Sequence, residues 1–282
     1  MSLPSRSDIR RRCTGKGRGA YICGVSKYPP TPDPAIGAML DAVRQAILSV
    51  VGPSLIGLYL FGSLTSGDFD PGVSDIDLIA ALADPPDEQV AVRLRKVHED
   101  LARANPDWDD RIEVVYVSKD GLADWRTDTT IAVISPGEPF HIVRAGREWA
   151  LNWYPAREDG VTLMGPPLHT LLPPISTAEY IDELRRYLAS FAKRVDDDAT
   201  PGVQAYAILS ICRGVFTIRH GDRLSKRQAA AWGPRAFPQW ADLIRRAVVW
   251  RDKQRDPDSQ NGHATIQETR AFVTEMTKLA LE

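Results

Sequence analysis

The sequence predicts an α/β domain with a small mixed sheet, followed by an all-α helical domain. In the first half of the chain, short apolar runs alternate with helical patterns, which is typical of an α/β unit. Residues 176–281 show helical periodicity alone. A length of 282 residues is ample for two domains. We expect a leader over residues 1–34, the α/β domain over 35–167 and the helical domain over 168–282.

The composition narrows the class of protein. Lysine and arginine number 35 against 37 acidic residues, so the chain has no general attraction for a nucleic acid. No run of about 18 apolar residues predicts a membrane span. Three cysteines without zinc-ligand spacing fit a reducing compartment. We therefore expect a cytoplasmic protein that binds neither nucleic acid nor membrane.

The elements of the α/β domain follow in order. The leader is rich in basic residues, glycine and proline, which is typical of a mobile segment. From Ala35, apolar residues recur at helical spacing as far as Gly52. Beyond Glu138 the pattern assigns no element up to the expected boundary. The remaining expectations are strands over 55–61, 75–81 and 111–117, and a helix over 87–105.

Helical periodicity and capping residues define the second domain. Ser176 and Glu179 have the spacing of a capping box, and Gly221 is a plausible helix stop. Five helices are expected, over 178–195, 203–220, 225–232, 237–250 and 265–281.

A glycine and a serine directly follow the first expected strand. Gly62 and Ser63, with Gly67 just beyond, can turn the chain sharply. Such a turn aims backbone N–H groups and the Ser63 hydroxyl at phosphate oxygens. The pair therefore predicts a grip on the phosphates of a nucleotide.

Three carboxylates follow at informative positions. Asp75 and Asp77 lie two residues apart at the start of a strand, where both side chains share one face. Magnesium is usually held by one or two carboxylates together with substrate phosphates. Glu113, between two apolar residues of the third strand, is expected to face the same cleft. There it either ligates a metal or takes the proton of an acceptor hydroxyl.

Taken singly, these residues also fit a simple turn and solvent-facing charges. Their order favours chemistry, because a strand, Gly-Ser, a Gly/Asp loop and Asp-x-Asp opening another strand meet several independent requirements. We predict a magnesium site formed by Asp75, Asp77 and Glu113.

Two segments carry a family resemblance. Leu60-Phe-Gly-Ser-Leu-Thr-Ser-Gly67 and Ser74-Asp-Ile-Asp-Leu78 resemble the signature of the polymerase-β-like nucleotidyltransferase superfamily. More of the chain is similar to the aminoglycoside adenylyltransferases, which inactivate streptomycin and spectinomycin and have a helical C-terminal domain. The resemblance implies transfer of AMP from ATP to a hydroxyl of a small, cationic antibiotic, with Glu113 as base. It also implies that Arg213 and Lys226 contact the ATP phosphates.

The chain departs from that family where the drug is held. Gly137 and Glu138 are followed by Pro139, whereas the streptomycin enzymes carry a tryptophan there. Residues 202–205 hold no acid before the helix, and the nearest acids are at 196–198. Two alternatives therefore stay open: transfer to another small molecule or to a protein hydroxyl, and a nucleotide-binding, antitoxin-like module.

Overall fold

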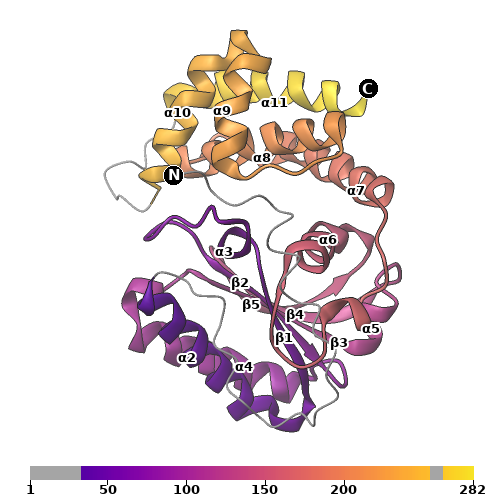
Figure 1. The fold of residues 1–282 in the computed structure, drawn as a ribbon. Helices are drawn as coiled ribbons and strands as arrows, with labels where there is room; N and C mark the ends of the chain where they lie inside the picture. Colours follow the sequence, from indigo (N-terminus) through magenta and orange to yellow (C-terminus); the bar gives the residue numbers. More distant parts are fainter. Residues whose placement is uncertain (1–32, 255–262) are drawn as a thin grey trace, which may run out of the picture.

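The computed structural model describes residues 33–254 and 263–282 and shows a sheet between two groups of helices (Figure 1). The leader expected over 1–34 lies almost wholly outside the described residues. The strands are β1 (Leu55–Phe61), β2 (Ile76–Leu82), β3 (Ile112–Ser118), β4 (Thr129–Ser135), β5 (Glu138–Ala145) and β6 (Val161–Met164). The helices of this half are α2 (Pro34–Val51), α3 (Ser63–Ser66), α4 (Glu88–Ala104), α5 (Lys119–Ala123) and α6 (Ala150–Asp159).

The sheet is mixed and has the order β5-β4-β3-β2-β1-β6. Its central pair, β2 and β3, runs parallel, with α4 in the connection between them. The other neighbours pair antiparallel. The predicted α/β domain with a small mixed sheet is confirmed.

Alternation along the strands sends side chains to two faces of the sheet. Leu78 and Val114 point into a core shared with α2 and α4. Ile79 and Val115 point into a second core, which includes residues of α6 and of the helical domain. Figure 1 shows the same layering, with α2 and α4 on one side and α6 on the other.

The helix α2 is the one candidate membrane span in the part of the chain that the structure describes. Over Pro34–Ser54 it is long and apolar enough to cross a bilayer by length and composition. Its apolar stripe, which includes Leu40, Val43 and Ile47, is buried in the core beneath the sheet. A buried core helix passes the same test.

The second half is helical, as predicted. Ser176 and Glu179 form the expected capping box, and Gly221 ends its helix in the left-handed region with a φ of 75°. The helices are α7 (Thr177–Ser190), α8 (Pro201–His220), α9 (Lys226–Ala236), α10 (Ala241–Asp252) and α11 (Ile266–Leu281). The expected second and fifth helices both begin and end within two residues of α8 and α11.

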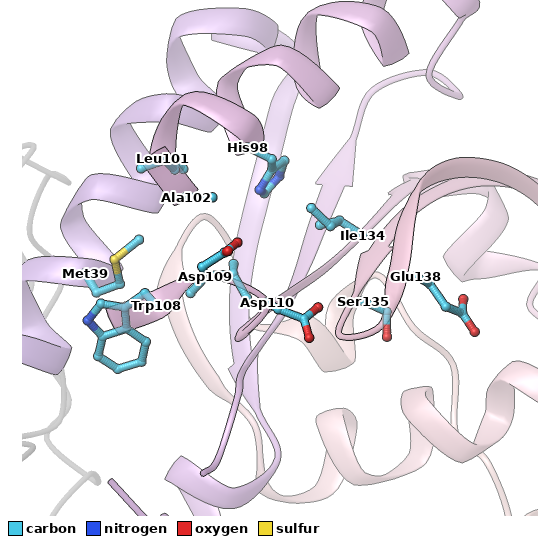
Figure 2. Close-up of a pocket in the computed structure, with 11 residues that line it drawn as sticks. Met39, His98, Leu101, Ala102, Trp108, Asp109, Asp110, Ile134, Ser135 and Glu138 are labelled. Carbon is cyan, nitrogen blue, oxygen red and sulfur yellow. The ribbon is translucent and has the colours of Figure 1, made fainter. Parts of the chain in front are cut away.

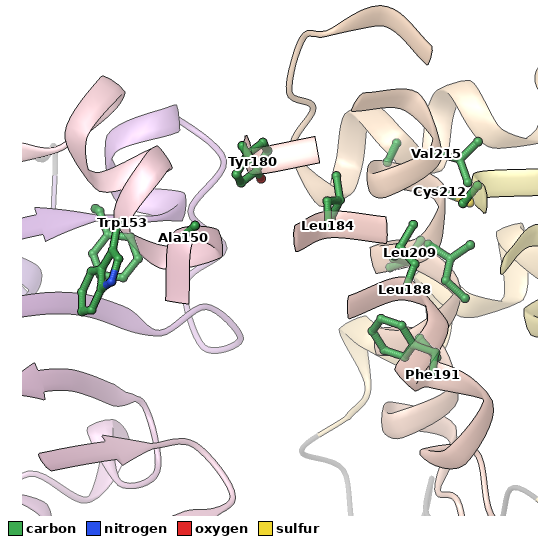
Figure 3. Packing of buried hydrophobic residues seen from close by; sticks show 14 of the residues in the cluster. Ala150, Trp153, Tyr180, Leu184, Leu188, Phe191, Leu209, Cys212 and Val215 are labelled. Carbon is green, nitrogen blue, oxygen red and sulfur yellow. The ribbon is translucent and has the colours of Figure 1, made fainter. Parts of the chain in front are cut away.

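The apolar core runs without a break from the sheet into the helical domain. Trp153 of α6 and Leu184 of α7 belong to one cluster, which continues to Leu209 and Cys212 of α8 (Figure 3). Trp153 is 2% exposed and Cys212 is fully buried, so both are core residues. The boundary predicted between residues 167 and 168 stays a prediction.

Candidate active site

Two of the predicted carboxylates are brought together by the register of the sheet. Asp77 of β2 pairs with Glu113 of the parallel strand β3. Each lies two residues before a side chain that points toward the helical domain, Ile79 and Val115 respectively. Asp77 and Glu113 therefore face the helical domain side by side. Asp75 lies one residue before β2 begins.

The carboxylates repel one another in a partly buried place. Burial is the main cause that raises the pKa of Asp77 well above its usual range, and the charges of Glu113 and Asp75 add to it. Burial also raises the pKa of Glu113, and the charge of Asp75 adds to the rise. This is an accumulation of negative charge that favours a bound cation.

Gly62 and Ser63 lie directly beside Asp77. Gly62 has a φ of 77°, and a Cβ placed on it would lie 1.9 Å from Asp77 Oδ2. Only glycine therefore allows the chain to pass this close to the carboxylate. The backbone N–H of Ser63, at the start of the single-turn helix α3, donates a hydrogen bond to Asp77. The structure thus joins the predicted phosphate grip to the predicted metal carboxylate.

A residue that the sequence did not point to orients Glu113. Ser135, the last residue of β4, donates its hydroxyl to Glu113 Oε2 at 3.0 Å. This hydrogen bond opposes the effect of burial and lowers the pKa of Glu113. A lone serine beside a Pro-Gly turn carries no sequence signal, so only the pairing of β3 with β4 reveals its role.

The helical domain supplies positive charge opposite the carboxylates. Lys226 is the first residue of α9, and its charge lowers the pKa of both Asp77 and Glu113. Burial lowers the pKa of Lys226, and the nearby charges of Arg213 and Arg251 lower it further. Arg213 Nε donates to the Leu224 carbonyl oxygen at 3.1 Å, two residues before Lys226. Both predicted cations therefore belong to one group that faces the sheet.

The carboxylates fit magnesium better than a metal that needs an all-protein cage. Among residues 33–254 and 263–282, no group of three or more His, Cys, Asp or Glu side chains converges as a metal site. Magnesium needs only one or two carboxylates besides phosphates and water. The raised pKa of Asp77 marks a surplus of negative charge that such an ion would relieve. That Asp75, Asp77 and Glu113 together hold magnesium stays a prediction.

A small pocket of about 120 Å³ borders Ser135 (Figure 2), and most of its apolar lining lies in or packs against the core shared with α2 and α4. Its inner wall is apolar and includes Trp108 and the buried His98. Its lining also holds the carboxylates of Asp109, Asp110 and Glu138. Figure 2 shows Asp110, Ser135 and Glu138 in a row on the side away from Met39. An acidic mouth therefore adjoins the partner of Glu113.

The acidic run at 196–198 is engaged within the helical domain. Asp197 pairs with Arg270 at 2.8 Å, and the Asp198 N–H donates to Asp196 Oδ1 at 3.1 Å. The run thus lies in the loop between α7 and α8, with its contacts inside the helical domain.

Comparison with known proteins agrees with this architecture. Residues 40–119 match the family described as Nucleotidyltransferase domain, and residues 170–278 match the family described as Aminoglycoside adenylyltransferase, C-terminal domain. A similar solved structure is the spectinomycin adenyltransferase AAD(9) from Enterococcus faecialis with ATP and spectinomycin. The likeness has a TM-score of 0.69 and 17% identity, and it covers 87% of this chain and 99% of that one. At this identity it concerns the fold.

A second solved structure, of a toxin-antitoxin with AMP-PNP, matches with a TM-score of 0.27 and 20% identity. It covers 55% of this chain and 90% of that chain. The two family matches place a nucleotidyltransferase domain and an adenylyltransferase helical domain in one chain, in the arrangement that the carboxylates and Lys226 already indicate. The chain therefore combines a segment that matches the nucleotidyltransferase domain family with one that matches the C-terminal domain family of the aminoglycoside adenylyltransferases.

Proposed function

We propose that the protein transfers AMP from ATP to a hydroxyl of an aminoglycoside or aminocyclitol, and so confers resistance to such an antibiotic in the cytoplasm. One observation carries the proposal. The paired carboxylates Asp77 and Glu113 face the cation of Lys226 across the two domains. A metal ion held by the carboxylates would offset part of the negative charge of a triphosphate, and Lys226 would offset a further part.

ATP, the donor of AMP, is held from the sheet and from the helical domain. Gly62 and Ser63 present backbone N–H groups and a hydroxyl from the sheet. Lys226 and Arg213 reach the phosphates from the helical domain, where charge-assisted hydrogen bonds to phosphate are strong. Asp75 and Asp77 would hold magnesium. When bound, the ion neutralises phosphate charge and orients the triphosphate.

Glu113 acts on the acceptor. Its carboxylate takes the proton of the acceptor hydroxyl while that oxygen bonds to the α-phosphorus of ATP. The bond between the α-phosphorus and the oxygen that bridges to the β-phosphate breaks, and pyrophosphate leaves. Ser135 holds the carboxylate in place through its 3.0 Å hydrogen bond. The raised pKa of Glu113 suits a group that must accept a proton.

Negative charge beside Glu113 supports a cationic acceptor, because, besides burial, the charge of Glu138 acts on Glu113 and raises its pKa. Asp109, Asp110 and Glu138 give the pocket beside Ser135 a negative lining, which attracts amino groups. The similar solved structure holds ATP and spectinomycin, so spectinomycin is the first acceptor to test.

The test is incubation with ATP, magnesium and a panel of aminoglycosides and aminocyclitols, followed by measurement of pyrophosphate and of AMP-modified product by mass spectrometry. We expect modification of at least one member. Glu113→Gln should lower turnover by about 100-fold or more, since general-base catalysis contributes that much. Asp75→Asn should abolish turnover while the fold, checked by circular dichroism, persists.

Negative results separate the alternatives. If no antibiotic is modified while an ATP analogue still binds, the antibiotic assignment is wrong. Labelled ATP added to a lysate then shows whether a protein or another small molecule becomes AMP-modified. If Asp75→Asn leaves nucleotide binding and every measured function intact, a binding-only module is favoured instead.

A further inference from the structure

A buried carboxylate joins the helical domain to the loop that precedes the metal carboxylates. This loop, residues 68–74, connects α3 to β2. The carboxylate of Asp70 receives Arg251 Nη1 at 2.5 Å on Oδ2 and Arg227 on Oδ1. Asp70 and Arg251 are each 9% exposed. We call this three-residue group, Asp70, Arg227 and Arg251, the interdomain clasp.

The sheet side fixes the same loop. The Asp70 N–H donates to Ser74 Oγ at 2.9 Å. The Ser74 carbonyl oxygen accepts two hydrogen bonds from Arg111, at 3.1 Å from Nε and 2.7 Å from Nη2. Arg111 directly precedes β3, and Ser74 directly precedes Asp75. The backbone that presents Asp75 is therefore tied to both domains at once.

On the other side, the clasp holds the start of α9. Arg227 follows Lys226 in the first turn of that helix. The Ser225 and Gln228 capping box makes this turn rigid, since it satisfies two backbone N–H groups reciprocally. A fixed Arg227 therefore fixes the backbone from which Lys226 extends.

We propose that Asp70 is a positioning residue, whose grip on Arg227 and Arg251 sets the spacing between Lys226 and the carboxylates before ATP binds. The inference rests on the proposed function for its catalytic consequence. Its structural part is that the spacing between Lys226 and the carboxylates is set without nucleotide. This part does not depend on which acceptor is used.

The burial of Asp70 and Arg251 supports a positioning role. A buried ion pair adds little net stability compared with apolar residues of similar volume, because desolvation offsets the attraction. Its geometry is nevertheless demanding, since a shift leaves a buried charge unpaired. A pair of this kind selects one arrangement of two domains over others.

A second contact between the same parts of the chain provides a matched control. Asp159, the last residue of α6, pairs with Arg223 in the loop between α8 and α9. The side chain of Asp159 is 42% exposed, against 13% for Asp70. This pair joins the sheet half to the helical half but does not touch the 68–74 loop.

The experiment measures the distance between the domains by pulsed electron paramagnetic resonance. Spin labels are placed at Val92→Cys on α4 and Ala231→Cys on α9, both exposed. Cys13 and Cys23 are replaced by serine, whereas Cys212 is buried and stays. Distances are recorded for the full chain without nucleotide and with a non-hydrolysable ATP analogue and magnesium.

We expect one narrow distance distribution in the unmutated chain, with and without the analogue. Asp70→Asn should broaden the nucleotide-free distribution, and Asp159→Asn should leave it narrow. With an acceptor that is turned over, Asp70→Asn should lower kcat by about 100-fold, as a misplacement near 1 Å can. The KM of the acceptor should change little. Asp159→Asn should stay within about fivefold of the unmutated activity, because exposed ion pairs contribute little.

A folded Asp70→Asn protein with an unchanged narrow distribution overturns the inference. If that variant does not fold, Arg227→Gln decides, because the Arg227 side chain is 57% exposed and its loss is tolerated more easily. An unchanged distribution in Arg227→Gln then overturns it. Absence of turnover in the unmutated chain would contradict the proposed function alone, since the distances are measured without turnover.

Discussion

Asp77 and Glu113 occupy paired positions on the adjacent parallel strands β2 and β3. The backbone register of the sheet centre therefore sets their proximity, and no loop conformation is needed to bring them together. Gly62 and Ser135 then approach this pair from β1 and β4, the strands on either side. Four neighbouring strands thus each contribute to one site.

Replacing Gly62 by alanine should inactivate the enzyme. The new Cβ would lie 1.9 Å from Asp77 Oδ2, so either the carboxylate or the strand end must move. We expect turnover to fall by about 100-fold or more, since misplacement of about 1 Å is that costly. Gly67→Ala is the control. It also has a positive φ, of 73°, but no atom lies within 4 Å of its Cβ. An equally large loss of activity in the two variants would show that backbone strain alone, and not the contact with Asp77, matters at Gly62.

Two capping boxes of equal type should differ in their effect on catalysis. Ser225→Ala removes the cap of α9, the helix that begins with Lys226, and Ser176→Ala removes the cap of α7. Each should lower the free energy of unfolding by about 1 kcal/mol. Only Ser225→Ala should also raise the KM of ATP, because it loosens the backbone that carries Lys226. Thermal melts and steady-state kinetics on both variants provide the measurement, and an equal KM in the two would remove the special role of this cap.

Arg111→Lys should weaken the site from the sheet side. Lysine keeps the charge but loses the planar fork that donates twice to the Ser74 carbonyl and lies 4.5 Å over the Trp108 ring. We expect a fall of about 2 kcal/mol in unfolding free energy from urea titration, together with lower turnover. Arg95→Lys is the comparison, because exposed Arg95 donates once to Phe140 O and lies 6.0 Å over its ring. If Arg95→Lys lowers stability and turnover as much as Arg111→Lys, the hydrogen bonds from Arg111 to the loop before Asp75 do not explain the effect.

The buried His98 should make stability depend on pH. Burial lowers its pKa from 6.5 to about 4, so between these values the unfolded chain binds more protons than the folded one. Stability should therefore fall as the pH decreases through this window, by at most about 3 kcal/mol from this residue. His98→Gln keeps a partner for the Tyr116 hydroxyl, which lies 2.6 Å from His98 Nε2, and should flatten the fall. Urea titrations at several pH values measure this pH dependence of the free energy of unfolding. The reference variant is His169→Gln, at an exposed position. Parallel pH curves for the unmutated chain and His98→Gln would contradict the prediction.

Local patterns in the sequence were enough to predict the centre of the fold. β1 agrees with its expected range, and β2, β3 and α4 each begin within one residue of theirs. The reason is that apolar periodicity reports which faces are buried. The same periodicity placed Asp77 and Glu113 on a common face, although their direct pairing required the parallel register.

The missing parts depend on contacts between distant segments. β4 and β5 form a hairpin around Pro136 and Gly137, and β6 is only four residues long. None of these three strands gives a strong local pattern of apolar residues. The contact of Asp70 with Arg251 spans 181 positions. The sequence around Asp70 does not predict a contact with Arg251, nor the reverse, because both residues become buried only when the helical domain packs over the sheet.

The interdomain clasp bears on how far the two halves can be exchanged between relatives. A chimera that joined this sheet to another helical domain would bring Asp70 to a surface chosen for a different partner. Unless that surface offers a cation in the place of Arg251, a carboxylate that is 9% exposed here would be buried without a counter-charge. Shuffling the halves to broaden acceptor range thus requires Asp70 to be exchanged together with the helices.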